Sequence, residues 1–384
     1  MCIVLLTTVL PSERRTGGEV VTQGVVEALR TVDADVRVLG YRRPGARTPA
    51  APGEQPVGTR PIETAAAGGR AIAWMAQATA RRMPYSSAKY WSRAYRRAAR
   101  EALTSGPAAV VVDHAQVHFA AEAAGRSHTP PLVFIAHNVE RDVYAGLAKP
   151  GSGRRSRWAN SREAKLIGRV EIDLAARARQ VWALTPEDAG YFQERCPGAD
   201  VRTLAVASQI EAPAATPEPA CDVALIGSWS WSSNARGLEW FAREVIPLLP
   251  GVSVRVAGTG AEWLRGRYPD VEVCGVVTDA AEFMRDARVV AVPSVAGGGV
   301  QVKTLDAVAS GVPVVATAPA ARGLEGLPAS VAVTDEPGDF ADALRGFLAD
   351  PGRDRMRSTS LEWSRTRRAR FEASVASWIG ELAA

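Results

Sequence analysis

The chain has 384 residues and a mass of 40.7 kDa, more than one hydrophobic core usually serves, so two domains are expected. Hydrophobic residues make up 47% and charged residues 23%, which is typical of an ordinary soluble protein and excludes a disordered or fibrous chain. The net charge of +5 is modest for this length, so bulk charge alone does not indicate nucleic-acid binding.

One cluster of arginines stands out from this background. It consists of Arg81, Arg82, Arg93, Arg96, Arg97 and Arg100. Such a cluster is compatible with acidic substrates, anionic lipid headgroups or nucleic acid. Its interleaving with alanine and glutamate favours the solvated face of a helix. Peripheral membrane contact therefore stays open, and no nucleic-acid partner is expected.

Cysteine usage and the amino terminus indicate a reducing compartment. The four cysteines lie far apart, with no Cys-x-x-Cys pattern and no histidine nearby, so neither a zinc site nor a disulfide framework is indicated. The apolar opening MCIVLLTTVL has no charged n-region and no small-residue cleavage site, and it is too short to span a bilayer. We therefore expect a cytoplasmic protein whose first residues form a buried strand.

In chain order, the first half opens with a strand, a glycine turn and a helix. Residues 2–8 form the strand, and Gly17 and Gly18 precede a helix that continues to about Arg30. The first N–H groups of such a helix and its dipole attract anions, so this turn is a candidate anion-binding loop. Residues 36–39 form the next strand. A loop rich in Pro, Gly, Ala and Thr is predicted over 43–69, and helical pattern over 71–104 with a break near Pro84.

Two continuous apolar runs follow, at 108–112 and 131–135, and they indicate parallel strands that are buried on both faces. Asp113 and His114 come directly after the first run, and His137 and Glu140 after the second. In open parallel sheets ligands bind beyond the carboxyl ends of the strands, so these polar residues are candidate site residues. The alternative for each histidine is a structural role with satisfied hydrogen bonds.

Residues 207–220 are rich in Pro and Ala, lack a hydrophobic period, and are predicted to be a linker. After it, residues 222–226 form a strand and 227–237 a loop that leads into a helix over 238–249. The strand at 252–257 turns at Gly258 and Gly260. Position 263 is Trp where a dinucleotide fingerprint has its third glycine, so that fingerprint is weak.

The stretch 289–317 predicts a strand, a glycine-rich loop over Gly297, Gly298 and Gly299, a helix and a second strand. Lys303 lies in or near the first turn of that helix, where the helix dipole disfavours a cation unless an anion lies opposite. It is one of only four lysines among 46 basic residues. The motif is not a P-loop, since Val302 stands where a glycine is required. Phosphate binding is therefore expected, and the alternative is a turn with a solvated lysine.

The order and spacing of these parts resemble a nucleotide-sugar glycosyltransferase of the GT-B type, and specifically the retaining family four (glycosyltransferase group 1). The segments that carry the likeness are TGGEVV, HNVE, GSWSWSSNARGLEWF, VAGTG and VPSVAGGGVQVKTLDAVASGVPVVAT. The resemblance implies an α/β fold of two Rossmann-like, doubly wound domains that face across a cleft. The acceptor-side domain would be 1–206, the linker 207–220 and the nucleotide-sugar domain 221–360, with a last helix at 361–384 that packs back on the first domain.

The resemblance also implies roles for individual residues. Arg236 and Lys303 match cations that meet the donor diphosphate, and His137 matches a histidine beside the transferred sugar. Asp306 stands where a family glutamate accepts hydrogen bonds from ribose. The remaining positions match backbone and loop contacts to the donor: Gly17, Gly18, Ser228, Gly258, Gly260, Gly298, Gly299, Val300 and Gln301.

Two departures from the family pattern concern the donor. The family pattern has two glutamates separated by seven residues, and the position of the first one is Gly298 in this chain. Ser228 stands where many members have an arginine. The hydrogen bond to the donor sugar must then come from another group. The base and sugar of the donor are left undetermined by these positions.

The expected activity is transfer of a sugar from a nucleoside-diphosphate sugar to a hydroxyl of a small-molecule, lipid or glycan acceptor, with retention of configuration. No cofactor and no metal are expected, because the only Asp-x-Asp, Asp33 to Asp35, lies where polar turn residues are usual. An NAD(P)-dependent oxidoreductase and a non-catalytic nucleotide or nucleic-acid binder remain the alternatives. The sequence does not determine the oligomeric state.

Overall fold

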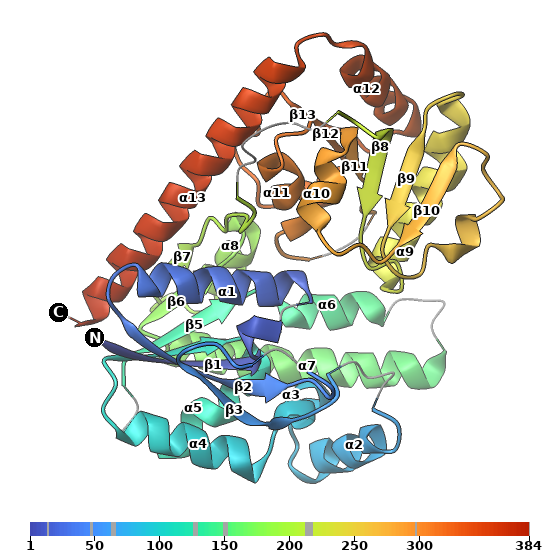
Figure 1. Ribbon diagram of the computed structural model, residues 1–384. Helices are drawn as coiled ribbons and strands as arrows, with labels where there is room; N and C mark the ends of the chain where they lie inside the picture. The colour runs from blue at the N-terminus through green and yellow to red at the C-terminus, as the bar shows by residue number, and fades with distance from the viewer. Residues whose placement is uncertain are drawn as a thin grey trace. The chain divides into compact units, whose positions relative to one another are not determined.

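The computed structural model describes residues 1–384 except 14, 47–48, 63–66, 126–129, 149–152, 212–217, 296–297 and 384. The chain forms two compact units (Figure 1). The first unit contains Met1–Ala205 and Phe371–Ala384, and the second contains Val206–Arg370. Each unit is an α/β structure around one parallel sheet. No described helix has both the length and the apolar content needed to cross a bilayer.

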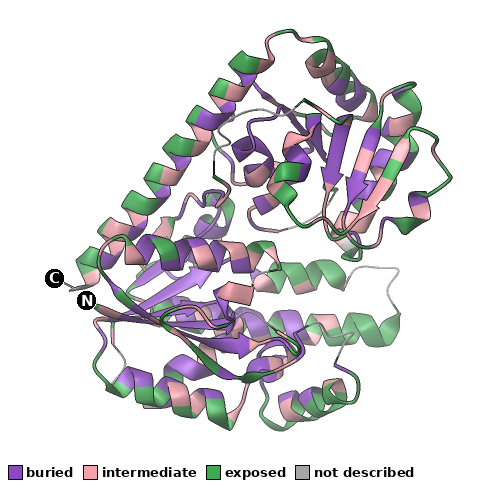
Figure 2. Cartoon of the chain, viewed as in Figure 1, coloured by how far each residue is buried: buried purple, intermediate pink, exposed green. Residues whose placement is uncertain are grey.

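The first unit is built on a seven-stranded parallel sheet with strand order β3-β2-β1-β4-β5-β6-β7. Its strands are β1 (Cys2–Val9), β2 (Asp35–Arg42), β3 (Glu54–Thr59), β4 (Ala109–Asp113), β5 (Leu132–Ala136), β6 (Gln180–Ala183) and β7 (Val201–Thr203). Every residue of β4 and β5 is buried, as the continuous apolar runs predict for strands that are covered on both faces (Figure 2).

Helices cover both faces of this sheet, with α1 on one face and α4 and α5 on the other (Figure 1). They are α1 (Gly17–Arg30), α2 (Arg70–Ala80), α3 (Tyr85–Tyr90), α4 (Arg93–Thr104), α5 (His118–Ala121), α6 (Glu140–Leu147), α7 (Arg154–Arg177) and α8 (Pro186–Arg195). In the arginine cluster, Arg96 is half-buried and the other five side chains are exposed. Arg97 pairs with Glu101 at 2.8 Å, and Arg81 stacks on Trp91.

One strand corrects the sequence prediction, because β3 lies within the stretch 43–69 that was predicted to be loop. β3 is an edge strand, paired only with β2, and four of its six residues are exposed. It also contains Pro56 and Gly58, which central strands avoid. An edge strand of this composition has no hydrophobic alternation to reveal it.

The second unit contains a six-stranded parallel sheet with order β10-β9-β8-β11-β12-β13. Its strands are β8 (Cys221–Ile226), β9 (Val254–Ala257), β10 (Val271–Gly275), β11 (Ala287–Val292), β12 (Val314–Ala316) and β13 (Val331–Val333). Its helices are α9 (Ser232–Trp240), α10 (Ala280–Arg285), α11 (Val302–Ala309), α12 (Pro337–Ala349) and the first part of α13 (Arg353–Ala383).

The structure corrects two predictions at the start of this unit. The predicted loop 227–237 is already helical from Ser232, and a π-helical segment, Phe241–Val245, follows α9. The predicted linker 207–220 is not a free connection where it begins, because Ala207 and Ser208 are buried in the second unit. Buried backbone there is satisfied by hydrogen bonds from α13, described below. Residues 212–217 of the predicted linker lie outside the described part of the chain.

Helix α13 belongs to both units, since its residues up to Arg370 group with the second and those from Phe371 with the first. Its last turns are anchored in the first unit by Trp378, whose ring packs against Trp182 at 5.6 Å between centroids. Gln180 Nε2 also donates to the carbonyl of Trp378, and Arg202 pairs with Glu381. These contacts hold the end of the chain against β6 and β7.

Candidate functional site

In the first unit, the strand order places a candidate site between β1 and β4. The chain proceeds outward from β1 through β2 to β3, and then returns to β4 on the other side of β1. Ligands bind at the carboxyl ends of the two strands where the order reverses. Here the glycines at the start of α1 follow β1, and Asp113 and His114 end and follow β4. His137 follows β5, the next strand.

Asp113 is fully buried at the centre of this group. Thr7 Oγ1 and Thr22 Oγ1 each donate to its Oδ2 at 2.7 Å, and its Oδ1 lies 2.6 Å from His137 Nε2. Burial alone would raise the pKa of the Asp113 carboxyl, but the two neighbouring histidines and the Thr7 hydroxyl hold it well below its usual range. Asp113 is therefore an anion, and His137 Nε2 carries the proton that it donates to this anion.

His114 is held in an uncommon conformation beside His137. Its φ is +80°, a region that non-glycine residues rarely occupy. Its ring stacks on the His137 ring at 3.8 Å with an interplanar angle of 21°. Burial, together with His137, lowers the pKa of His114 to about 4, so its ring is neutral at pH 7. Backbone strain of this kind occurs where the surroundings impose it, commonly at functional sites.

The second ring nitrogen of His137 has no partner. Nδ1 is buried and has no hydrogen bond within the described part of the chain. It lies beside Gly18, where an added Cβ would be 3.5 Å from Nδ1 and 3.3 Å from His114 Cε1. Because buried polar atoms are normally satisfied, an unpartnered ring nitrogen at a switch point is the atom most suited to a ligand. The structure thus brings Gly18, Asp113, His114 and His137 together.

Glu140 starts α6 just beyond His137, and both its backbone N–H and its side chain are hydrogen-bonded. Its backbone N–H donates to Glu171 Oε1 at 2.6 Å, and burial raises the pKa of Glu171 to about 8. Burial also raises the pKa of Glu140, whose side chain accepts from Asn138 at 3.4 Å. Glu140 is thus held by α7 and Asn138 and is not one of the groups that contact Asp113.

Asp113, His114 and His137 are also the one described group with ligand atoms close enough for a metal ion, within 4.8 Å of one another. Their arrangement does not fit a metal. The nearest atom pair is already a hydrogen bond of 2.6 Å, and two threonine hydroxyls occupy the other carboxylate oxygen. The histidine rings are stacked, so their nitrogen lone pairs lie in nearly parallel planes and do not converge on one point.

The second unit has its own reversal of strand order, between β8 and β11. Here backbone segments approach so closely that side chains are excluded. A Cβ at Gly258 would lie 1.8 Å from the carbonyl oxygen of Gly227, and one at Gly237 would lie 2.0 Å from that of Pro293. Gly260, with φ of +90°, approaches Trp229 and Ser230 in the same way. The loops after β8, β9 and β11 are thereby held together.

Lys303 lies in the first turn of α11 among these loops. Its Nζ donates to Asn234 Oδ1 of α9 at 3.1 Å and lies 5.9 Å from the centre of the Trp229 ring. It forms no ion pair with any described acidic residue. Burial lowers the pKa of Lys303 to about 8, because desolvation of an ammonium without a counterion favours the neutral form. A partly buried cation that lacks an anion is suited to binding one.

The other predicted residues of this unit lie on the same loops. Arg236 is exposed on α9, two residues from Asn234, and has no hydrogen bond or ion pair to the described residues. Ser228 is exposed, its hydroxyl 3.2 Å from that of Ser230. Gly298, Gly299, Val300 and Gln301 lead into α11, where Gln301 is the N-cap and Gly299 has φ of +67°. Gly297 lies outside the described residues.

Asp306 is one turn further along α11 from Lys303. Its Oδ1 accepts a hydrogen bond of 2.6 Å from Ser208 Oγ. Burial raises the pKa of Asp306 to about 6, with the Ser208 hydroxyl acting in the opposite direction. Asp306 Oδ2 has no partner among the described residues. At pH 7 the carboxylate therefore has one oxygen held by the protein and one available as an acceptor.

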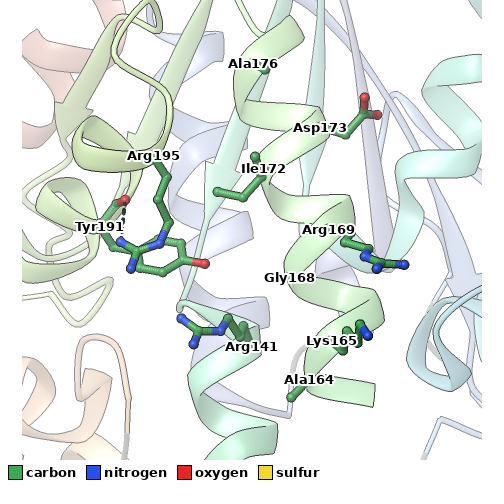
Figure 3. Close-up of a pocket in the computed structure, with 10 residues that line it drawn as sticks. All are labelled: Arg141, Ala164, Lys165, Gly168, Arg169, Ile172, Asp173, Ala176, Tyr191 and Arg195. Carbon is green, nitrogen blue, oxygen red and sulfur yellow. Dashed lines mark hydrogen bonds between the residues drawn. The ribbon is translucent and has the colours of Figure 1, made fainter. Parts of the chain in front are cut away.

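A groove of about 690 Å³ on the first unit is distinct from both groups (Figure 3). Its walls come from α6, α7 and α8, and its four cations are Arg141, Lys165, Arg169 and Arg195. Arg141 lies 3.6 Å from Asp142, and Arg195 pairs with Glu194 at 2.7 Å and stacks on Tyr191. None of the predicted site residues lines it, and two of its four cations, Arg141 and Arg195, already lie beside acidic residues. We do not assign it a ligand.

Four residues of these groups were missed by the sequence analysis: Thr7, Thr22, Asn234 and Ser208. Thr22 lies one helical turn after Gly18, with its Oγ1 3.0 Å from the carbonyl oxygen of Gly18, a spacing visible in the sequence once the helix is known. Asn234 lies two residues before Arg236. Thr7 was hidden within an apolar strand and Ser208 within the predicted linker, so no local pattern marked either.

The architecture matches solved structures of GT-B glycosyltransferases over the whole chain. Sucrose-phosphate synthase from Thermosynechococcus elongatus is 16% identical, with a TM-score of 0.67 over 99% of this chain and 98% of that one. HepE from Anabaena, in complex with UDP and glucose, is 13% identical with a TM-score of 0.62 over 99% and 98%. A UDP-forming trehalose-phosphate synthase from Burkholderia xenovorans is 13% identical with a TM-score of 0.62 over the full length of both. The chain therefore has the GT-B fold.

The sequence comparison is more local. Residues 220–350, which lie in the second unit, match the family model described as Glycosyl transferases group 1. This part of the chain is thus similar to the group 1 glycosyltransferases, and the protein is a glycosyltransferase. No curated protein sequence matches the chain significantly.

Proposed function

We propose that the protein transfers a sugar from a nucleoside-diphosphate sugar to a hydroxyl acceptor, with retention of configuration and without a bound metal. The family match of residues 220–350 supports glycosyl transfer. HepE, a structural neighbour, has been solved with UDP and with UDP-glucose, which makes uridine the first nucleotide to test. The finer assignment to retaining family four rests on the sequence motifs.

The observation that carries the proposal is Lys303. Its ammonium is partly buried at a switch point, has a pKa lowered to about 8 and has no described carboxylate to pair with. Leaving such a charge without a partner is unfavourable unless a ligand supplies the anion. A diphosphate placed against the start of α11 would meet Lys303, the helix dipole and the exposed Arg236 of α9.

These groups can also lower the reaction barrier. As the glycosidic bond to phosphate breaks, negative charge grows on the diphosphate and positive charge on the sugar carbon. Cations already in place stabilise that charge without further reorganisation, which is usually the largest catalytic contribution of such a site. Arg236 and Lys303 are proposed to stabilise the leaving group, and Asp306 Oδ2 to accept from a ribose hydroxyl.

The first unit is proposed to hold the reacting sugar and the acceptor. His137 Nδ1 is available for a ligand hydroxyl because Nε2 is engaged by Asp113. Gly18 leaves space beside it that any side chain would reduce. Asp113 is then a positioning residue, which fixes the ring orientation of His137 through a buried hydrogen bond.

The positions of the paired acidic residues support the proposed independence of a metal. Asp33 and Asp35 occupy the turn and strand start before β2 and do not belong to either site. The charge on the diphosphate would be balanced by Arg236 and Lys303 instead. Retention implies that the acceptor hydroxyl attacks on the face from which the diphosphate leaves, and no carboxylate is placed as a covalent nucleophile.

Thermal-shift measurements in the presence of EDTA test the proposal directly. We expect at least one of UDP, GDP and dTDP to raise the melting temperature, because a ligand that binds only the folded state stabilises it. NAD and NADP serve as the contrasting ligands. Stabilisation by NAD(P) alone, or by nucleotide only when Mg²⁺ or Mn²⁺ is added, would contradict the proposed donor or its metal independence respectively.

A further inference from the structure

The segment through which the chain enters the second unit is hydrogen-bonded to the proposed nucleotide site. The boundary between the units falls between Ala205 and Val206. Ser208, the third residue of the second unit, is buried, and its hydroxyl donates to Asp306 Oδ1 at 2.6 Å. The same hydroxyl oxygen accepts from the Ile210 N–H at 3.0 Å. Because Ile210 occupies an oxygen lone pair, the single hydroxyl proton is directed at Asp306.

Helix α13 holds the same segment from a second side. Arg368 Nη2 donates to the carbonyls of Ser208 and Ile210 at 2.7 and 2.9 Å. Arg367 Nε donates to the carbonyl of Val206 at 2.7 Å, and its Nη2 to that of Gly323 at 3.1 Å. Burial lowers the pKa of Arg367 to about 10, which still leaves it charged at pH 7. The backbone of Val206–Ile210, which is buried from Val206 to Ser208, is therefore held by charged donors.

Arg367 and Arg368 lie close to the point where the chain passes from the second unit back to the first. Arg370 is the last residue of α13 in the second unit, and Phe371 belongs to the first. Both connections between the units, Val206–Ile210 and the α13 segment around Arg367 and Arg368, are thus bonded to each other inside the second unit. Through Ser208 they are also bonded to Asp306.

We propose that Ser208 is a positioning residue for Asp306 and couples occupancy of the nucleotide site to both chain connections. This inference rests on the proposed function, in which Asp306 accepts from ribose. Ser208 holds one carboxylate oxygen and thereby turns the other toward the ligand. In return, a ribose hydroxyl bound to Oδ2 fixes the Asp306 rotamer and strengthens the hold on Val206–Ile210.

The first test is a double-mutant cycle on affinity for UDP, GDP or dTDP, whichever binds, with Ser208→Ala and Asp306→Ala. We expect Ser208→Ala to weaken nucleotide binding about tenfold, or about 1.4 kcal/mol. In the Asp306→Ala background the same substitution should have almost no further effect, because Ser208 acts only through Asp306. Ser330→Ala removes another buried serine hydroxyl of this unit, bonded to Ser360, and should leave affinity unchanged.

The second test is hydrogen exchange in a peptide that contains Val206–Ile210. We expect Asp306→Ala to speed exchange there in the ligand-free protein, and bound nucleotide to slow it in the wild type but not in Ser208→Ala. The coupling would be overturned if the effects of the two substitutions on nucleotide affinity were additive. It would also be overturned if the exchange rate of Val206–Ile210 changed neither with Asp306→Ala nor with bound nucleotide. Either result would leave the proposed function intact. If the wild type binds none of the three nucleotides, the proposed function fails and the inference with it.

Discussion

The two switch-point groups use charge in opposite ways. In the first unit, the Asp113 carboxylate is surrounded by two hydroxyls and a histidine N–H, so its charge is matched within the protein. In the second unit, the Lys303 ammonium contacts the neutral amide oxygen of Asn234 and the Trp229 ring but no described carboxylate, and the exposed Arg236 has no described partner. In the first site the charged group is already hydrogen-bonded, and His137 Nδ1 is the atom without a described partner. In the second site, neither Lys303 nor Arg236 forms an ion pair with a described residue.

Under the proposed function, this difference assigns a different part of the substrate to each unit. A cation without an anion gains most from a ligand that is itself charged, such as a diphosphate. A buried carboxylate whose oxygens are already hydrogen-bonded needs no further cation, and the one open ring nitrogen beside it suits a neutral hydroxyl. In the proposed function, a glycine turn at a reversal of strand order therefore serves a phosphate in one unit and a sugar in the other.

The largest expected effect is the loss of the unmatched cations. Lys303→Ala and Arg236→Ala should each lower turnover by about a hundredfold, since a charge aimed at a leaving group is worth roughly 3 kcal/mol in the transition state. Lys303→Ala should leave the melting temperature unchanged or raise it, because the folded protein no longer desolvates an ammonium. Initial rates of nucleoside diphosphate release and thermal unfolding measure the two effects.

Arg243→Ala is the matched control for Arg236, because Arg243 lies just beyond α9 and already pairs with Glu239 at 2.7 Å. It should retain full turnover. Parallel losses of stability and activity in the Lys303 and Arg236 variants would instead show that both cations are structural, and the contrast between the two units would not hold.

Closing the space between the loops of the second unit should have the next largest effect. Gly258→Ala places a methyl 1.8 Å from the Gly227 carbonyl oxygen at a φ of +111°, so the loops must separate. We expect a loss of about 2 kcal/mol in the free energy of unfolding together with weaker nucleotide binding. Gly251→Ala is the control, with φ of +76° but open space around it. Both variants carry the cost of an alanine at positive φ. Chemical denaturation should therefore show a larger loss in the free energy of unfolding for Gly258→Ala than for Gly251→Ala, and the difference measures the clash with Gly227.

The fold was largely predictable from the sequence, because buried parallel strands are continuous apolar runs and glycine turns mark where helices begin. The runs before Asp113 and His137 placed both residues at strand ends without any knowledge of the neighbouring strands. What escaped prediction has no such signal. Strand β3 is an exposed edge, and Ser208 lies in a segment whose Pro and Ala content is typical of linkers.

The site could be predicted only one residue at a time. Lys303 was identified by its place in a helix turn, but its partner Asn234 lies 69 residues away on another helix, and their contact depends on tertiary packing. The stacking of His114 on His137 likewise depends on a positive φ that no sequence pattern predicts. Local sequence motifs therefore could not predict contacts between side chains of different loops.

His137→Ala sharpens the comparison from the side of the first unit. It should lower turnover about 30-fold, or about 2 kcal/mol, the typical cost of losing one hydrogen bond in a desolvated site, while nucleotide affinity stays within about tenfold. His118→Ala is the control, since Nδ1 of the His118 ring lies 3.1 Å from the carbonyl of Ala115 and 3.5 Å from Ser87 Oγ, neither of which belongs to the site. Turnover and calorimetric titration with the nucleotide separate the two quantities. Abolished nucleotide binding, or unchanged turnover, would mean that the two units do not divide the substrate as proposed.

The smallest expected effect is the pH dependence that Lys303 imposes, and its two signs distinguish a ligand-binding cation from a structural one. With a folded-state pKa of about 8, Lys303 is charged below that pH, so nucleotide affinity should fall by up to about tenfold between pH 7 and 9. The stability of the ligand-free protein should change in the opposite direction. Between about pH 8 and the usual lysine pKa of about 10.4, the unfolded chain binds the proton and the folded chain does not, so this group contributes stability that increases with pH. Lys303→Met should remove both trends, and subtracting its curves from those of the wild type cancels other groups that titrate in this range. If affinity and stability rise together with pH, or if both trends survive in Lys303→Met, then Lys303 is not the cation that binds the diphosphate.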